Sequence, residues 1–193
     1  GIMIVTPYYS KPSQHGILRH FEEISKITDL PIMAYNIPGR TSTLIELETL
    51  QTLVDDIGIH SIKDAVGDFE FSKKQLELLK DKVDIYSGND NQTYDFVING
   101  GVGVVSVASH VVGDEISEMI SFAKDNDLEK AEEINMQLSN LFEAIFEEPS
   151  PGPIKKILSE SWEEVGEPLL PITSITPELA NKIRGFYKKI KEN

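Results

Sequence analysis

The sequence predicts an α/β fold built on a parallel sheet, and two patterns carry that prediction. Short β-rich runs alternate with longer segments of helical periodicity, and the runs begin about 20 to 30 residues apart, as repeated βα units do. The runs are almost continuously apolar, which is typical of parallel strands that are buried on both faces. These runs occupy residues 2–6, 32–36, 59–63, 84–87 and 103–107.

Helical segments connect these runs and then make up the rest of the chain. Residues 16–27 and 46–54 carry apolar side chains three or four positions apart, the spacing of an amphipathic helix. Further helices are expected at residues 69–80, 91–99, 111–125, 128–147, 153–164 and 177–190. The last three follow one another without a strand between them. We therefore expect an α/β domain at residues 1–126 and a helical domain at residues 127–193.

Two topologies are compatible with five βα units. A (β/α)8 barrel needs eight strands, so five units do not close one. An open doubly wound sheet is the rival, but it usually carries a glycine-rich turn after its first strand, whereas residues 6–9 read Thr-Pro-Tyr-Tyr. The glycines at residues 100–103 precede a strand, which is the wrong context for a dinucleotide-binding motif.

Composition excludes several classes of function. A net charge of −14 argues against nucleic acid as a partner, because phosphate binding needs basic patches. No apolar run approaches the roughly 18 to 20 residues that span a bilayer, so we expect no membrane association and a cytoplasmic location. The chain has no cysteine, and its four histidines lack the spacing of metal ligands. We expect neither a metal nor a cofactor.

Lys63 is the most informative single residue. It closes the apolar run at residues 57–62, and small or acidic residues follow it. An ammonium at the end of a buried strand is poorly solvated and readily becomes a neutral, nucleophilic amine, which is the requirement for Schiff-base chemistry. The local pattern also fits a lysine that extends from a strand end into water.

Polar residues at other strand ends form a coherent set with Lys63, because barrel enzymes place catalytic groups on the loops after the strands. Lys63 could condense with a 2-oxo acid, Tyr35 could transfer protons through its hydroxyl, and Arg40 could hold a carboxylate. Taken singly, each has a plainer interpretation. Tyr35 and Tyr9 also suit the wall of a pocket, and Arg40 suits a solvated loop charge.

Several segments of the chain, in the same order and spacing, resemble the dihydrodipicolinate synthase family. The segments are residues 5–9 (VTPYY), 35–41 (YNIPGRT), 62–65 (IKDA), 87–90 (SGND) and 103–107 (GVVSV), with further likeness at 148–151 and 170–173. The resemblance runs the length of the chain. It implies a (β/α)8 barrel, here incomplete and represented by about its last five βα units, followed by a C-terminal helical domain.

The resemblance also implies a function. The family condenses pyruvate with aspartate 4-semialdehyde through a lysine Schiff base to give 4-hydroxy-tetrahydrodipicolinate, the committed step toward diaminopimelate and lysine. Lys63 matches the Schiff-base lysine, Tyr35 the proton-relaying tyrosine, and Arg40 the arginine that receives the carboxylate of the semialdehyde. The other matches are Tyr9, which in the family reaches the relay from a neighbouring subunit, Gly88 and Val105 in the pyruvate pocket, and Tyr8 as a remnant of the allosteric lysine site. A homo-oligomer, tetramer or dimer, is implied.

Two alternatives stay open. Other 2-oxo acid aldolases, such as N-acetylneuraminate lyase, resemble the chain at residues 35–38 but lack an arginine two residues further on, so Arg40 favours the synthases. A non-catalytic homologue is the second alternative.

The chain departs from the family pattern in two places. The family begins with three further βα units that carry a Gly-Thr-Thr-Gly-Glu type motif, and Ser150 and Gly152 also differ from its pattern. We therefore expect an N-terminally truncated member whose 193 residues alone have little or no activity.

Overall fold

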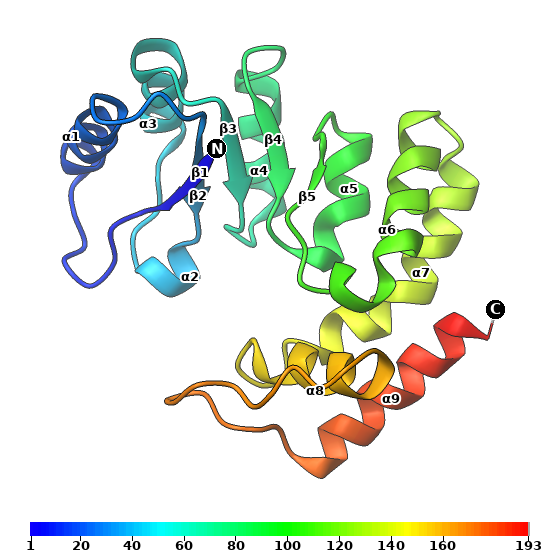
Figure 1. The fold of residues 1–193 in the computed structure, drawn as a ribbon. Helices are drawn as coiled ribbons and strands as arrows, with labels where there is room; N and C mark the ends of the chain where they lie inside the picture. Colours follow the sequence, from blue (N-terminus) through cyan, green and yellow to red (C-terminus); the bar gives the residue numbers. More distant parts are fainter. Residues whose placement is uncertain (193) are drawn as a thin grey trace. The chain divides into compact units, whose positions relative to one another are not determined.

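Five parallel strands form one sheet in the computed structural model, which describes residues 1–192 (Figure 1). The strands are β1 (Ile2–Val5), β2 (Ile32–Asn36), β3 (Ser61–Asp64), β4 (Asp84–Ser87) and β5 (Gly103–Val104). They pair in the order in which they occur along the chain, each parallel to the next. The predicted parallel sheet is confirmed.

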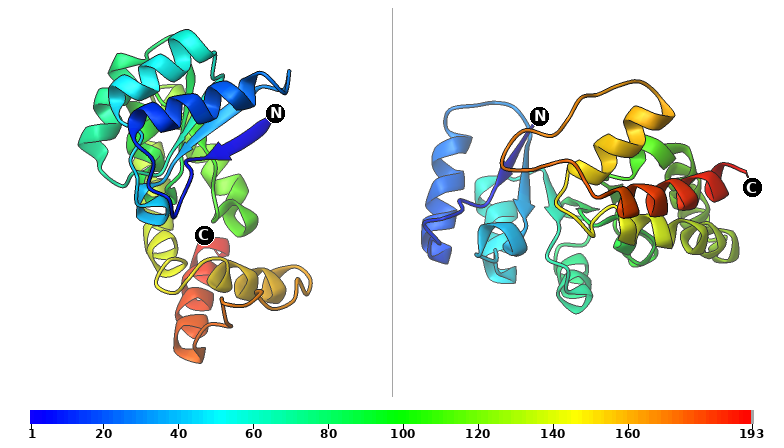
Figure 2. Two further views of the ribbon diagram at one scale, coloured as in Figure 1. Left: turned by 90° about the vertical axis from the view of Figure 1, so that its left-hand side faces the viewer. Right: turned by 90° about the horizontal axis from the view of Figure 1, so that it is seen from below.

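The helices that follow the first four strands cover a single face of this sheet (Figure 2). They are α1 (Gln14–Ser25), α3 (Leu47–Thr52), α4 (Phe69–Leu78) and α5 (Thr93–Ile98). A doubly wound sheet has helices on both faces and reverses its strand order, whereas a barrel keeps one order and one helical layer. The arrangement is therefore that of a barrel segment.

The chain divides into two compact units, Gly1–Val105 and the part from Ser106 onward. The domain boundary predicted from the sequence, near residue 126, where the pattern changes to helices without strands, lies one helix further along the chain. In the second unit, α6 (Ser109–Lys124) packs along α7 (Leu128–Ala144). Apolar residues on both helices, including Ile116 and Leu138, are buried.

The core of the first unit lies between the sheet and its helices. Successive side chains of a strand point to opposite faces, so every second strand residue enters this core. The buried residues include Ile32, Ala34, Ile62 and Ile85 from the strands and Phe21, Leu50, Leu76 and Phe96 from the helices. The intervening residues, Tyr35 and Lys63 among them, point to the opposite face of the sheet. That face carries the candidate site.

One helical turn after β2 was not predicted from the sequence. α2 (Pro38–Thr41) has proline at its first position, where the missing N–H removes no hydrogen bond, and it ends at Ser42 with a left-handed φ of 57°. Four residues are too few to show a helical period of apolar side chains. Arg40 lies on this turn.

Several elements differ from their predicted bounds, and two of them show a physical reason. The predicted helix at residues 46–54 is α3 followed by a π-helical segment, η1 (Leu53–Ile57), which ends at Gly58 with a φ of 80°. The predicted strand at residues 103–107 stops at Val104, because the chain turns there into α6. The hydroxyl of Ser106 accepts a hydrogen bond of 2.8 Å from the N–H of Ser109 at that turn.

The second unit is helical, as predicted. Besides α6 and α7 it contains α8 (Gly152–Ser161) and α9 (Pro177–Lys191), and α9 packs against both α7 and α8. The hydroxyl of Thr176 caps α9 by accepting from the N–H of Leu179. None of the helices formed by residues 1–192 combines the length and the apolar character needed to cross a membrane.

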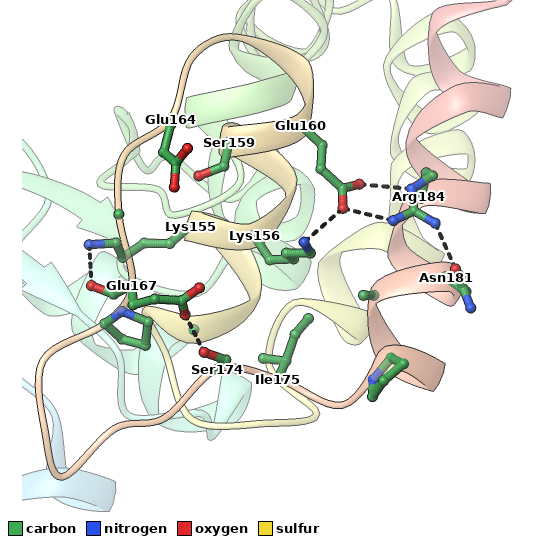
Figure 3. A pocket seen from close by; sticks show the side chains of 15 residues that line it. Lys155, Lys156, Ser159, Glu160, Glu164, Glu167, Ser174, Ile175, Asn181 and Arg184 are labelled. Atoms are coloured by element: carbon green, nitrogen blue, oxygen red, sulfur yellow. Dashed lines mark hydrogen bonds and ion pairs between the residues drawn. The ribbon is translucent and has the colours of Figure 1, made fainter.

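Ion pairs join α8 and α9 across a pocket of about 500 Å³ within this unit (Figure 3). The guanidinium of Arg184 donates through Nε and Nη2 to the two carboxylate oxygens of Glu160, both at 2.7 Å. Lys156 Nζ lies 3.1 Å from the same carboxylate. These hydrogen bonds lower the pKa of Glu160 from 4.5 to about 2. On this side of the pocket, one carboxylate is therefore paired with two cations.

Replacing Glu160 with Gln should lower the free energy of unfolding by no more than about 1 kcal/mol, because the ion pair is partly exposed to water. The pKa of Glu160 is lower in the folded chain, so the pair stabilises the fold fully above pH 4.5 and loses its effect as the pH falls toward about 2. Urea unfolding of wild type and variant at several pH values measures this difference. A difference that is as large at pH 2 as at neutral pH would contradict the assignment.

Candidate active site

One residue from each strand contributes to a row across the face of the sheet that the helices leave uncovered. Val5, Tyr35, Lys63, Tyr86 and Gly103 are in register on the five adjacent strands. Residues in register share a face and lie side by side. The row places Lys63 at the middle of the sheet, between two tyrosines.

Lys63 is buried, with a relative exposure of 9%. Its Nζ lies 4.2 Å from the centroid of the Tyr35 ring. Burial lowers the pKa of Lys63 because it penalises the charged form, and the negative charge of Asp90 partly opposes the shift. The side chain therefore does not extend into water, and a larger fraction of it is neutral amine than for an ordinary lysine.

Tyr35 is half-buried beside this amine. Burial raises the pKa of its phenol, and the positive charge of Arg40 acts in the opposite direction. The hydroxyl is therefore protonated at neutral pH and is able to donate or accept a hydrogen bond. Arg40 is exposed on α2, the first turn after β2.

Gly88 lies against the side chain of Lys63 at the end of β4. A Cβ at Gly88 would come within 2.7 Å of Ala65 Cβ and within 3.0 Å of both Lys63 Cε and the backbone oxygen of Asp64. Only glycine fits this space. Val105 follows β5 at the same edge of the sheet, where its N–H donates to the carbonyl of Ser87 at 2.9 Å.

The remaining predicted residues, Tyr8 and Tyr9, are not brought to Lys63 within this chain. They lie in the loop after β1, with relative exposures of 67% and 95%. Tyr9 has a φ of 65°, the left-handed region that a residue with a side chain rarely adopts. Two exposed aromatic side chains at this position have few contacts in the first unit.

Asp90 lies in the segment at residues 87–90 but was given no role from the sequence, although it acts on Lys63. Its side chain is 1% exposed, at the start of the short helix η2 (Asp90–Gln92) that follows β4. Its charge raises the pKa of Lys63 and so favours the ammonium. In a chain with 32 acidic residues, a single aspartate after a strand carries no distinguishing signal other than its place at a strand end.

The lowered pKa of Lys63 predicts a shifted labelling profile. The rate at which acetic anhydride acetylates Lys63, followed by peptide mass spectrometry, should level off at a lower pH than the rate for the surface lysines of the same sample. Replacing Asp90 with Asn should move the Lys63 profile to still lower pH, because the charge that favours the ammonium is removed. A Lys63 profile that coincides with the surface profile would show a solvated amine.

Comparison with known proteins agrees with this geometry. The model of the Dihydrodipicolinate synthetase family matches residues 1–190. The 4-hydroxy-tetrahydrodipicolinate synthase of Listeria monocytogenes serotype 4b is 36% identical over 192 residues, which cover 100% of this chain and 66% of the relative. The chain therefore spans just under two thirds of the length of this relative.

Solved structures show the same likeness. The dihydrodipicolinate synthase of Thermotoga maritima superposes with a TM-score of 0.95 and 32% identity over 99% of this chain and 66% of that one. The chloride-inhibited dihydrodipicolinate synthase of Acinetobacter baumannii, complexed with pyruvate, superposes with a TM-score of 0.93 and 31% identity. The match covers 98% of this chain and 65% of that one. The five βα units are thus part of a (β/α)8 barrel, as predicted. With the family model matched over residues 1–190, the chain belongs to the dihydrodipicolinate synthetase family.

Proposed function

We propose that the protein is a Schiff-base-forming lyase that condenses pyruvate with aspartate 4-semialdehyde to give 4-hydroxy-tetrahydrodipicolinate, on the route to diaminopimelate and lysine. The observation that carries the proposal is the buried amine of Lys63, with its lowered pKa, 4.2 Å from the Tyr35 ring. The family match over residues 1–190 supports the choice of reaction.

The first half-reaction forms an imine. The neutral amine of Lys63 attacks the carbonyl carbon of pyruvate, a C–N bond forms, and the carbonyl oxygen leaves as water. The lowered pKa of Lys63 favours this step because only the free amine is a nucleophile. The absence of a side chain at Gly88 allows the Lys63 side chain to pass close to the end of β4, and Val105 borders the same strand edge.

The second half-reaction forms the new C–C bond. Loss of a proton from the methyl carbon of the imine gives an enamine, which attacks the aldehyde carbon of the second substrate, and the aldehyde oxygen takes up a proton to become the hydroxyl. The amino group of the second substrate then attacks the imine carbon, which closes the ring and releases Lys63 as the free amine. We assign the transfer of these protons to Tyr35, because its ring lies 4.2 Å from Lys63 Nζ and its phenol, which is protonated at neutral pH, can both donate and accept a hydrogen bond. Arg40, exposed on α2 and close enough to influence Tyr35, would bind the carboxylate of the semialdehyde through its planar fork.

We assign Tyr9 to a neighbouring subunit's site in a homo-oligomer. Its side chain is 95% exposed in this chain and so is free to reach across an interface. Tyr8, 67% exposed beside it, stays a prediction as a remnant of an allosteric lysine site. A cytoplasmic location also stays a prediction.

The test is reductive trapping with pyruvate and borohydride, applied to the protein that carries this sequence. Hydride reduces the imine to a stable secondary amine, so peptide mass spectrometry should find a reduced pyruvyl adduct on Lys63. Lys73 and Lys155 provide internal controls, since both lie outside the row that holds Lys63. Adduct on either of these, with none on Lys63, would overturn the proposal.

The Arg40→Ala variant distinguishes this reaction from those of other 2-oxo acid aldolases. It should raise the KM for aspartate 4-semialdehyde while leaving pyruvate trapping on Lys63 intact, because the guanidinium serves only the second substrate. Unchanged kinetics with the semialdehyde would return Arg40 to a solvated loop charge. Trapping on Lys63 without turnover of this aldehyde would favour another 2-oxo acid aldolase.

A further inference from the structure

A row of buried polar side chains lies one residue beyond the row that contains Tyr35 and Lys63. Asn36, Asp64 and Ser87 are in register at the ends of β2, β3 and β4, and their relative exposures are 0%, 1% and 0%. Because strand residues alternate between faces, these three point to the helix-covered side of the sheet. We call them the polar row.

Asn36 holds the loop that carries Arg40. Its Oδ1 accepts from the N–H of Ile45 and its Nδ2 donates to the carbonyl of Ile45, both at 3.0 Å. The amide therefore closes residues 37–45 into a loop with one side chain, and α2 lies inside it. The hydroxyl of Thr41 adds hydrogen bonds to the carbonyls of Ile37 and Thr43 within the same loop.

Asp64 and Ser87 hold the loops after their own strands in the same way. The Asp64 carboxylate accepts from the N–H of Val66 and from the hydroxyl of Ser72 on α4, both at 2.9 Å. The Ser87 hydroxyl donates to the carbonyl of Asn89 at 2.8 Å and accepts from the N–H of Asn89 at 3.2 Å. These two hydrogen bonds join Ser87 to Asn89, the residues on either side of Gly88, and Asn89 directly precedes Asp90.

The backbone of the polar row links each loop to the next. The carbonyl of Asp64 accepts from the N–H of Gly88 at 2.5 Å, and the carbonyl of Ser87 accepts from the N–H of Val105 at 2.9 Å. The carbonyl of Asn36 accepts from the N–H of Ala65 at 2.9 Å. Each member therefore binds its own loop through its side chain and the following loop through its carbonyl.

We propose that Asn36, Asp64 and Ser87 are positioning residues, each of which sets the geometry of one part of the active site without touching substrate. Asn36 positions Arg40, whereas Asp64 and Ser87 position the Gly88 side of Lys63. The inference rests on the proposed function, because it assigns a separate loop to each half-reaction. It goes beyond that function because it assigns a positioning role to residues on the helix-covered face of the sheet, opposite the face that carries Lys63.

The hydrogen bonds of the polar row support a positioning role, because they join buried side chains to the loops around the active site. A buried polar group costs free energy relative to an apolar one unless it is paired, so apolar side chains would serve a purely structural core as well. The three side chains instead bind backbone groups of loops that lead to residues around Lys63 and Arg40. A displacement of about 1 Å in such a loop can lower a rate about 100-fold.

The test measures the two half-reactions separately. Asn36→Ala should raise the KM for the aldehyde and leave the rate of pyruvate trapping unchanged. The expected rise is about 10- to 100-fold, the effect typical of losing a residue that orients a metal ligand without touching the metal. Ser87→Ala should slow trapping on Lys63 and change the aldehyde KM little. Leu79→Ala is the control, because Leu79 is buried in the same core but belongs to no loop at this edge of the sheet.

A conservative pair tests the same idea at Asp64. Asp64→Asn keeps an acceptor for Val66 and can pair with Ser72, whose hydroxyl already has a second acceptor in the carbonyl of Asp68 at 3.2 Å. This variant should trap pyruvate at nearly the rate of wild type, whereas Asp64→Ala should be slow. Equal losses in both variants would contradict a role through hydrogen bonding.

The outcomes separate this proposal from the proposed function. If Asn36→Ala and Ser87→Ala lower both half-reactions by one common factor, as a loss of stability does in Leu79→Ala, the polar row is only structural. If wild-type protein forms no adduct on Lys63, the proposed function fails first. The acetylation rate of Lys63 then still tests the row, because Ser87→Ala should change that rate and Asn36→Ala should not.

Discussion

Replacing Lys63 with Met should abolish both imine trapping and turnover. Methionine has a similar length and fills the same buried space, so the variant removes the nucleophile without opening a cavity. The loss should exceed the roughly 100- to 1000-fold that follows removal of one transition-state hydrogen-bond donor, because no covalent intermediate can form. A coupled turnover assay and borohydride trapping measure the two effects.

Stability provides the control for this variant. The lowered pKa of Lys63 means that the fold disfavours its ammonium, so an apolar side chain at this position should leave the free energy of unfolding unchanged or higher. Lys63→Arg keeps a positive charge but offers no nucleophile, and it should be equally inactive. Turnover by either variant near the wild-type rate would show that the reaction does not pass through Lys63.

The fold was predictable because the residues that form the core recur at regular spacings along the strands and helices. Runs such as residues 32–36 are apolar on the side that packs against Phe21 and Leu50, and their ends carry the polar residues that begin the loops. The choice between a barrel and a doubly wound sheet depended on strand order and on which face the helices cover. Neither is encoded by the local spacing of apolar residues.

The candidate site was predicted in part. Lys63 and Tyr35 could be singled out because each lies at a strand end, where the residue type contrasts with the apolar run before it, whereas Gly88 and Val105 were assigned only through the family resemblance. The burial of Lys63 and its distance from Tyr35 required the register of β2 against β3. The place of Tyr9 could not be derived from local pattern, since its exposed side chain makes few contacts in its own chain.

The polar row shows a different limit. Asn36, Asp64 and Ser87 are ordinary residues for the end of a strand, and as single positions they indicate only that a loop begins. Their common role appears when the register aligns them and their hydrogen bonds are known. A one-residue slip in the register would exchange this row with the one that contains Lys63.

Gly88→Ala should impair the site more than its one added methyl group suggests. The new Cβ would approach Ala65 Cβ to 2.7 Å and Lys63 Cε to 3.0 Å, so one of these side chains or the strand end must move. The backbone oxygen of Asp64, also at 3.0 Å, closes the remaining direction. Overpacking of this kind costs about 1 to 3 kcal/mol, and a shift of Lys63 by about 1 Å should lower the trapping rate about 100-fold.

Gly185→Ala is the matched control for this substitution. Gly185 lies in α9, and a Cβ there would meet no atom within 4 Å. Alanine is the better helix former by about 0.8 to 1 kcal/mol, so this variant should unfold at the same or a slightly higher urea concentration, with unchanged trapping. If Gly88→Ala behaves like Gly185→Ala in both measurements, the space beside Lys63 is larger than these contacts allow, and Gly88 does not position the amine.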